Sequence, residues 1–264
     1  MNSPQIRFED GAAYETYMGV WSRDVGEAFL RWLAPAPGWR WADVGCGNGA
    51  FTELLVQRCA PAEVKGVDPA AAQVAFARDR FANEARVAFE VGDAQALPWA
   101  EAAFDAATMA LVIFFVPDPA KSVAEMARVA RPGGSVSTYA WDLLGGGNPY
   151  AAMFEAMGEL GIAQSGPPSP EASRLESLRA LWQDAGLVDL ETETFEVRRE
   201  YESFDRYWDI ARTGPRVATT IAGLSDPDRA RLREALRRRV PADGTGRLVC
   251  TARANAIKGR VADR

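Results

Sequence analysis

The segment ADVGCGNGAF, residues 42–51, decides the fold of this sequence. Asp43 ends a short apolar run, and Gly45, Gly47 and Gly49 follow at alternate positions. Residues 50–60 then carry apolar side chains at helical spacing. Because glycine has no Cβ, a turn of this kind lets a ligand approach the backbone closely. The segment therefore predicts a nucleotide-type cofactor site at a strand-to-helix turn.

Runs with strand character and runs with helical periodicity alternate along the rest of the chain. Strands are predicted over 39–44, 62–68, 85–93, 103–114, 135–141, 187–201 and 246–259. Helices are predicted over 23–34 and 50–60, around 74–81 and 123–130, near 150–160, and over 172–185, 203–213 and 227–239. This alternation predicts an α/β fold with a doubly wound, Rossmann-like, mostly parallel seven-stranded sheet and helical lid insertions.

The chain of 264 residues is predicted to form a single domain over 1–264. The sheet core is assigned to 36–142, 185–200 and 246–260. The helical lid is assigned to 1–35, 143–184 and 201–245, and it is expected to fold over the sheet.

Composition excludes several classes of function. The net charge of −6 disfavours a nucleic-acid partner, because phosphate backbones need clustered positive charge. Three widely separated cysteines predict neither a disulfide framework nor a metal site. No membrane-spanning run or signal pattern is evident, so a cytoplasmic protein with no membrane partner, monomeric or homodimeric, is expected. The sequence has no histidine, which excludes any mechanism that needs a histidine base or ligand.

Three successive predicted strands end in a carboxylate, at Asp43, Asp68 and Asp93. Ligands of open α/β sheets lie outside the carboxyl ends of the strands, so these acids should meet in one site. Asp68 suits the ribose of either a dinucleotide or S-adenosylmethionine (SAM), because a carboxylate accepts two hydrogen bonds from a diol. Asp43 and Asp93 favour SAM. SAM has no phosphate and carries a sulfonium and an ammonium group, whereas Asp43 would repel a pyrophosphate.

An ordered set of short motifs follows the same pattern: DVGCGNG (43–49), GVDP (66–69), GDA (92–94) with LP (97–98), FD (104–105) and RPGG (131–134). With this set the sequence resembles a class I SAM-dependent methyltransferase of the small-molecule kind related to the quinone-biosynthesis C-methyltransferases. The resemblance covers residues 39–141, and YMGVWSRDV (17–25) resembles the segment that closes over SAM in such enzymes. Residues 143–245 match no motif, and Phe114-Phe115 replaces a histidine pair that relatives often have.

The resemblance implies a site for SAM, with S-adenosylhomocysteine as the product. Asp43 and the loop backbone from Gly45 to Gly47 would face the methionine end, Asp68 the ribose, and Asp93 with Ala94 the adenine. The expected cofactor-binding residues are Asp43, Gly45, Cys46, Gly47, Asp68, Pro69, Asp93, Ala94, Met109, Ala110, Tyr17 and Arg23. The expected substrate pocket comprises Tyr14, Trp21, Phe114, Phe115, Trp141 and Tyr150, and no metal is expected.

The predicted function is methyl transfer from SAM to a small-molecule acceptor by in-line displacement. The sequence leaves the acceptor, the atom methylated and any general base open. Two alternatives remain. The first is a non-catalytic SAM-binding protein. The second is an NAD(P)-dependent oxidoreductase, which the pattern Gly45-x-Gly47-x-x-Ala50 would also fit.

Overall fold

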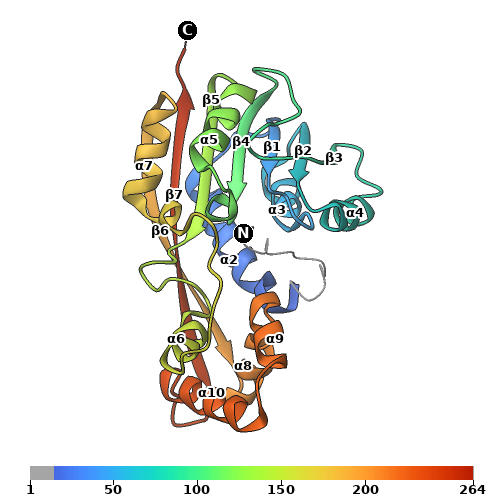
Figure 1. The fold of residues 1–264 in the computed structure, drawn as a ribbon. Coiled ribbons are helices and arrows are strands. Elements are labelled where there is room, and N and C mark those ends of the chain that lie inside the picture. The colour runs from blue at the N-terminus through green and yellow to red at the C-terminus, as the bar shows by residue number, and fades with distance from the viewer. Residues whose placement is uncertain (1–14, 264) are drawn as a thin grey trace.

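The computed structural model describes residues 15–263 and contains a seven-stranded sheet with helices on both faces (Figure 1). The strands are β1 (Arg40–Val44), β2 (Glu63–Asp68), β3 (Val87–Val91), β4 (Phe104–Ala110), β5 (Ala130–Trp141), β6 (Leu187–Tyr201) and β7 (Leu248–Val261). Their order is β3-β2-β1-β4-β5-β7-β6. β7 is antiparallel to both of its neighbours, and the other pairings are parallel. The predicted mostly parallel seven-stranded sheet is confirmed.

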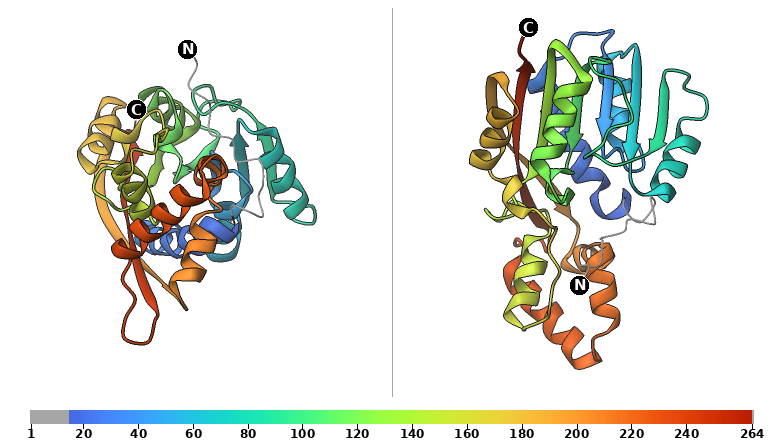
Figure 2. Two further views of the ribbon diagram at one scale, coloured as in Figure 1. Left: turned by 60° about the horizontal axis from the view of Figure 1, so that its bottom comes forward. Right: turned by 45° about the horizontal axis from the view of Figure 1, so that its top comes forward.

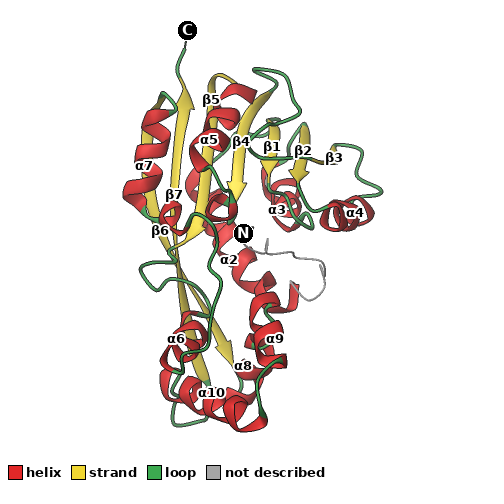
Figure 3. Cartoon of the chain, viewed as in Figure 1, coloured by secondary structure: helices red, strands yellow, loops and turns green. Residues whose placement is uncertain are grey.

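Helices cover both faces of this sheet (Figure 3). They are η1 (Glu15–Gly19), α2 (Val20–Leu33), α3 (Ala50–Cys59), α4 (Ala71–Arg80), η2 (Ile113–Phe115), α5 (Pro119–Val129), α6 (Ala151–Glu159), η3 (Pro170–Ser173), α7 (Leu175–Asp184), α8 (Phe204–Ala211), α9 (Pro215–Ala222) and α10 (Asp226–Arg239). α2 and α3 pack together on one face, and α5 and α7 pack together on the other.

The strand order places a crevice at the carboxyl ends of β1 and β4. From β1 the chain moves outward through β2 to β3, and it then returns to β4 on the other side of β1. Open α/β sheets bind ligands where the strand order reverses in this way. β1 lies inside the sheet, between β2 and β4, and is buried from Trp41 to Val44. The residues that follow β1 and β4 are therefore the first place to look for a site.

A helical lid stands below these strand ends. β6 and β7 continue past the rest of the sheet, and α6, α8, α9 and α10 gather at their far end (Figures 1 and 2). α6 packs against α10, and Leu232 and Leu236 of α10 are fully buried. Burial of such side chains contributes about 1.5–3 kcal/mol each, and Leu232 and Leu236 belong to the same hydrophobic cluster as the sheet core.

Two helices of the expected lid lie against the sheet instead. α2 packs on α3, β6 and β7, and it buries Val25 and Phe29. α7 packs on α5, β6 and β7, and it buries Leu178 and Trp182. The Trp182 indole also donates a 3.0 Å hydrogen bond to the Val136 carbonyl of β5. α2 and α7 therefore belong to the layers that cover the sheet, because their apolar faces pack on it.

The remaining differences from the predicted elements are local. β5 begins at Ala130, so the RPGG motif lies inside the strand, and the pairing with β4 shifts register at Phe104. α9 and the π-helical turn η1 were not predicted. α10 is capped by Ser225, whose hydroxyl accepts the Asp228 N–H at 3.3 Å, and Asp226 is its first residue.

Candidate functional site

The glycine loop after β1 turns its backbone donors into the protein. The N–H groups of Gly45 and Cys46 both donate to the Val67 carbonyl, at 2.8 and 3.0 Å, and Gly49 donates to Cys46. Gly45, Gly47 and Gly49 all have positive φ, from 52° to 81°, a region that favours glycine. No atom lies within 4 Å of the place where a Cβ on Gly47 would stand. The loop therefore leaves open space over Gly47.

Gly45 also fixes the loop that follows β4. A Cβ built on Gly45 would lie 2.5 Å from a methyl carbon of Val112. Real side chains do not tolerate such a separation, so Val112 packs directly on the Gly45 backbone. This contact joins the glycine loop to the residues from Leu111 to Phe115.

Asp68, at the end of β2, is held by the backbone on both sides. One carboxylate oxygen accepts the Ala70 N–H at 2.9 Å, and the other accepts the Gly47 N–H at 3.0 Å. Burial raises the pKa of Asp68, and the two backbone hydrogen bonds oppose that shift. Each carboxylate oxygen keeps a second lone pair. The side chain is therefore oriented to accept further hydrogen bonds from a ligand diol.

Asp43, at the end of β1, is fully buried beneath the same loop. One of its oxygens accepts the Thr52 hydroxyl at 2.5 Å, and the other, Oδ1, has no hydrogen-bond partner. Desolvation raises the pKa of Asp43 to about 7, and the nearby Asp68 carboxylate adds to the shift. An unpaired buried oxygen is costly in isolation, so this position favours a positively charged neighbour.

These contacts suit SAM and do not suit a dinucleotide. A dinucleotide needs free N–H groups at the start of the helix for its pyrophosphate. Here the Gly47 N–H donates to Asp68, the Gly49 N–H to Cys46, and the Ala50 N–H to the Asn48 side chain at 3.2 Å. Asp43 and Asp68 add negative charge where a phosphate would have to bind. A cofactor with a sulfonium, an ammonium and a ribose diol fits this donor-poor, carboxylate-rich turn.

The other predicted cofactor residues occupy the ends of the neighbouring strands. Asp93 follows β3, is exposed, and accepts the Gln95 N–H at 2.9 Å, while Ala94 is nearly buried. Pro69 follows Asp68 and is exposed. Three predicted residues remain. Cys46 is buried in a small cluster with Val74, Ala77 and Phe89. Met109 is fully buried in β4, and Ala110 after it is half-buried.

A partly open, mostly apolar cavity of about 80 Å³ lies between these strand ends and the lid. It is lined by Tyr17, Met18, Leu111, Phe114, Phe115, Trp141, Leu143, Asn148, Phe154, Pro167, Gly214, Pro215 and Val217. Three of the predicted pocket residues, Phe114, Phe115 and Trp141, are therefore in its wall. Leu111 has a φ of 61°, a conformation that costs a non-glycine residue about 1 kcal/mol or more and that often marks functional sites.

Tyr17 connects the N-terminal segment to this cavity. Its ring stacks on Tyr150 with centroids 4.1 Å apart and planes inclined by 11°. A Cβ on Gly214 would lie 2.5 Å from the Tyr17 ring, so the start of α9 rests directly on that ring. The buried Tyr150 hydroxyl donates a 2.6 Å hydrogen bond to the Tyr17 carbonyl. Tyr150 thus supports the pocket from behind and is not in its wall.

Three other predicted residues have different surroundings. The Trp21 side chain is fully buried in the hydrophobic core and does not line the cavity. Arg23 forms an ion pair with Glu53 of α3 at 3.2 Å, and its side chain is half-exposed. Tyr14 lies outside the described residues. Trp21 was expected in the substrate pocket, but α2 places its side chain in the core and not in the wall of this cavity.

The Tyr150 hydrogen bond gives a first testable result. Tyr150→Phe removes one buried hydrogen bond and leaves the Tyr17 carbonyl without that donor, which should lower the free energy of unfolding by about 1–2 kcal/mol. Urea denaturation measures the loss. Tyr207→Phe is the matched control, because the Tyr207 hydroxyl makes no hydrogen bond to residues 15–263. Equal effects in both variants would mean that the hydrogen bond to Tyr17 does not anchor the segment.

Several site residues were not predicted from the sequence. Leu111, Val112, Asn148 and Val217 come from segments without a recognisable motif. The one local signal is the sequence NPY at 148–150, since Asn148 Oδ1 accepts the Tyr150 N–H at 2.8 Å in a turn that asparagine favours.

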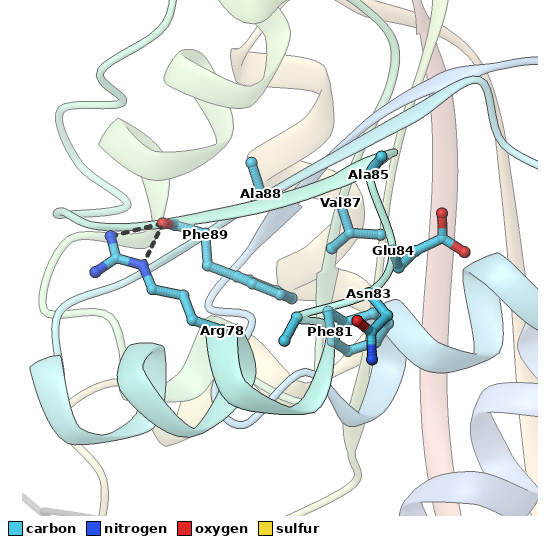
Figure 4. Close-up of a pocket in the computed structure, with 9 residues that line it drawn as sticks. Arg78, Phe81, Asn83, Glu84, Ala85, Val87, Ala88 and Phe89 are labelled. Carbon is cyan, nitrogen blue, oxygen red and sulfur yellow. Dashed lines mark hydrogen bonds between the residues drawn. The ribbon is translucent and has the colours of Figure 1, made fainter.

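A second, open hollow lies far from the strand ends just described. It is lined by residues from α4 to β3, among them Arg78, Phe81, Asn83 and Phe89 (Figure 4). The Nε and Nη2 groups of Arg78 both donate to the Phe89 carbonyl, at 3.0 and 2.8 Å, so one edge of the guanidinium is bonded within the protein. Within residues 15–263, no cluster of acids and cysteines could hold a metal ion, and no helix has the length and apolar character to span a membrane.

Comparison with known proteins agrees with this site. Residues 42–138 match the family described as a methyltransferase domain. The demethylmenaquinone methyltransferase of Renibacterium salmoninarum is 31% identical over 173 residues, which cover 62% of this chain and 67% of that protein. The malonyl-[acyl-carrier protein] O-methyltransferase of Methylococcus capsulatus is 35% identical over 132 residues, 48% of each chain.

Solved structures share the fold. Phosphoethanolamine N-methyltransferase 2 of Haemonchus contortus, in complex with S-adenosylhomocysteine, superposes with a TM-score of 0.63 at 19% identity. The superposition covers 99% of this chain and 59% of that one. The alignments to the first three curated relatives cover only 33%, 48% and 35% of their lengths. With its matching domain, its menaquinone-methyltransferase relative and its glycine loop, the chain belongs to the class I SAM-dependent methyltransferase family.

Proposed function

We propose that this protein binds SAM at the glycine loop and transfers its methyl group to a small apolar acceptor in the adjoining cavity. The observation that supports this most is the contact between Gly45 and Val112. It places a carboxylate-rich cofactor turn directly beside an apolar cavity whose wall includes Leu111 and Phe114. This proximity supports a methyl-transfer site formed by the turn and the cavity together.

On this proposal Asp68 accepts hydrogen bonds from the ribose hydroxyls, and Asp93 with the Ala94 N–H contacts the adenine. Asp43 and the loop around Gly47 would lie toward the methionine end. When bound, SAM supplies a methyl group activated by a sulfonium. The buried Asp43 carboxylate then has a positively charged neighbour, which compensates its desolvation.

Tyr17 and Arg23 have different parts in this proposal. Tyr17 closes the cavity from the side of η1, because its ring lies between Tyr150 and Gly214. Arg23 is on the next turns of the same segment, and it would have to leave Glu53 to reach the cofactor carboxylate. The exposed Arg23–Glu53 ion pair contributes no more than about 1 kcal/mol, so breaking it to bind the cofactor carboxylate would cost little free energy.

The cavity contributes alignment and the exclusion of water. Holding an acceptor against the methyl carbon converts a bimolecular reaction into a unimolecular one, which lowers the barrier by about 7–11 kcal/mol. Apolar walls such as Met18, Phe154 and Val217 keep water away from the reacting atoms. A cavity of about 80 Å³ admits a compact group, which supports a small-molecule acceptor.

Calorimetry tests the cofactor directly. The purified chain should bind SAM and S-adenosylhomocysteine with micromolar affinity and show no heat with NADH. The physical reason is that the N–H groups of Gly47, Gly49 and Ala50 already have acceptors within the protein, and that the carboxyl groups of Asp43 and Asp68 lie at the same turn. Tighter binding of NADH than of SAM would overturn the proposed function.

A further inference from the structure

The cavity contains two side-chain donors that have no acceptor. Asn148 Oδ1 accepts the Tyr150 N–H at 2.8 Å, which fixes the orientation of the amide and turns Nδ2 away from that backbone. Among residues 15–263, nothing accepts a hydrogen bond from Asn148 Nδ2 or Trp141 Nε1. The Trp141 side chain is only 3% exposed, and its indole nitrogen is not among the sealed, unpaired atoms of the interior. Both residues line the cavity, and neither donor is satisfied within the described part of the chain.

Among the described residues, the same cavity has no carboxylate or amine in its wall that could act as a general base. None of its lining residues is Asp, Glu, Lys, Arg or His, and Tyr17 is the one titratable side chain in the wall. The nearest carboxylate in sequence, Asp142, is bonded to Arg253 at 2.7 Å and to the Gly145 N–H at 3.0 Å. An acceptor that must lose a proton during transfer therefore finds no ready base in the described residues.

We propose that the methyl acceptor is a carboxylic acid with an apolar body, bound as its carboxylate, and that Asn148 and Trp141 orient this carboxylate by donating to it. The proposal rests on the proposed function, because the methyl group comes from SAM. Donors without acceptors suit an oxygen that only accepts. A hydroxyl or an ammonium group would bring its own N–H or O–H donors into a wall that has few acceptors for them.

The reaction balances without a proton transfer. A carboxylate oxygen supplies the electron pair for the new O–CH3 bond, and the sulfonium sulfur keeps the pair of the broken S–CH3 bond. The products are a methyl ester and a neutral thioether. The negative charge of the carboxylate and the positive charge of the sulfonium disappear together, which suits an apolar cavity that contains no counter-ion of its own.

Matched acceptors test the class of substrate. We would use cyclohexanecarboxylate, cyclohexylmethanol and cyclohexylmethylamine, and the corresponding hexanoate, hexanol and hexylamine, with SAM at saturation. Formation of S-adenosylhomocysteine is expected with the carboxylates alone. Their kcat/KM should be constant from pH 6 to pH 9, because a carboxylate is already ionised in that range and no protein base has to titrate.

An isosteric variant tests the role of Asn148. Asn148→Asp keeps an oxygen for the Tyr150 N–H and presents a second oxygen, in place of the amide donor, to the carboxylate. The kcat/KM for the carboxylates should fall at least ~10-fold, while the affinity for S-adenosylhomocysteine stays the same. Asn83→Asp, on the exposed turn between α4 and β3 (Figure 4), makes the same chemical change outside the cavity and should have no effect.

Three results would overturn the proposal. The first is turnover of the alcohols or amines in preference to the carboxylates. The second is a higher rate in Asn148→Asp, because a new carboxylate would then be serving as a base. The third is failure of every carboxylate to react while S-adenosylhomocysteine still binds, which rejects this acceptor class and leaves the cofactor proposal standing. A chain that binds neither SAM nor S-adenosylhomocysteine would reject both.

Discussion

Asp68→Ala is expected to weaken S-adenosylhomocysteine binding at least tenfold, and by more than ~100-fold where both hydrogen bonds are lost in full. On the proposed function the Asp68 carboxylate accepts both ribose hydroxyls, and each charge-assisted hydrogen bond contributes roughly 1.5–3 kcal/mol. The carboxylate is already oriented by the N–H groups of Ala70 and Gly47, so little ordering opposes the binding. Isothermal titration calorimetry gives the dissociation constant, and circular dichroism reports whether the fold survives.

The backbone contacts of Asp68 require two further variants. Asp68→Ala also frees the Gly47 N–H, so part of its effect could come from a displaced loop. Asp68→Asn keeps an oxygen for one of these N–H groups, and its dissociation constant should lie between those of the wild type and the alanine variant. Asp79→Ala, an exposed carboxylate on the neighbouring helix α4, is the control for net charge. Unchanged affinity in a folded Asp68→Ala protein would remove Asp68 from the cofactor site.

The sheet and the cofactor turn could be predicted because their signals are local. The glycines at 45, 47 and 49 need positive φ, and this requirement shows in the sequence as residue type. Asp43 and Asp68 stand at the ends of strands whose apolar runs are visible without a structure. Parallel order then brings these carboxylates to one edge of the sheet, so their proximity could be predicted from the strand ends alone.

The acceptor cavity could not be predicted, because distant segments create it. Val112 belongs to the site through its contact with Gly45, 67 residues earlier in the chain, and no pattern in its own segment indicates that contact. Asn148 looks like an ordinary turn residue until the fold places it in the same cavity wall as Trp141. The apolar stripes of α2 and α7 predicted helices correctly, but they did not say whether the sheet or the lid would cover them.

Trp21 is a residue whose surroundings could not be predicted from its own segment either. Aromatic residues near the N-terminus suggested a closing segment, and Tyr17 does lie in the cavity wall. Trp21, four residues later, points into the core, because α2 begins at Val20 and turns that position inward. The helix predicted over 23–34 begins three residues earlier, at Val20, so Trp21 belongs to it, and helix starts are the least certain part of a sequence-based assignment.

Asp43 should make the cofactor-free protein less stable as the pH rises from about 4 to about 7. Burial raises its folded-state pKa from 3.8 to about 7, so over this range the folded protein holds a proton that the unfolded chain has released. Such a group stabilises the fold below the unfolded pKa, and that contribution is lost as the pH rises through the folded pKa. The loss amounts to roughly 4 kcal/mol at most.

Asp43→Asn removes this titration and serves as the test. The asparagine oxygen can still accept the Thr52 hydroxyl, while its amide adds a buried donor that costs about 1–3 kcal/mol at every pH. The free energy of unfolding of the wild type, measured in urea from pH 4.5 to pH 8.5, should therefore fall relative to the variant by a few kcal/mol.

Asp105→Asn is the control of opposite sign. Arg131, at 2.7 Å, helps to hold the pKa of Asp105 below its usual value, so the stabilisation from Asp105 is present above pH 3.8 and is lost at lower pH. Over the range of the experiment Asp105→Asn should follow the pH dependence of the wild type. Parallel curves for the wild type and Asp43→Asn would show that Asp43 is ionised throughout. The cofactor turn would then hold a permanent buried negative charge even before a cationic ligand arrives.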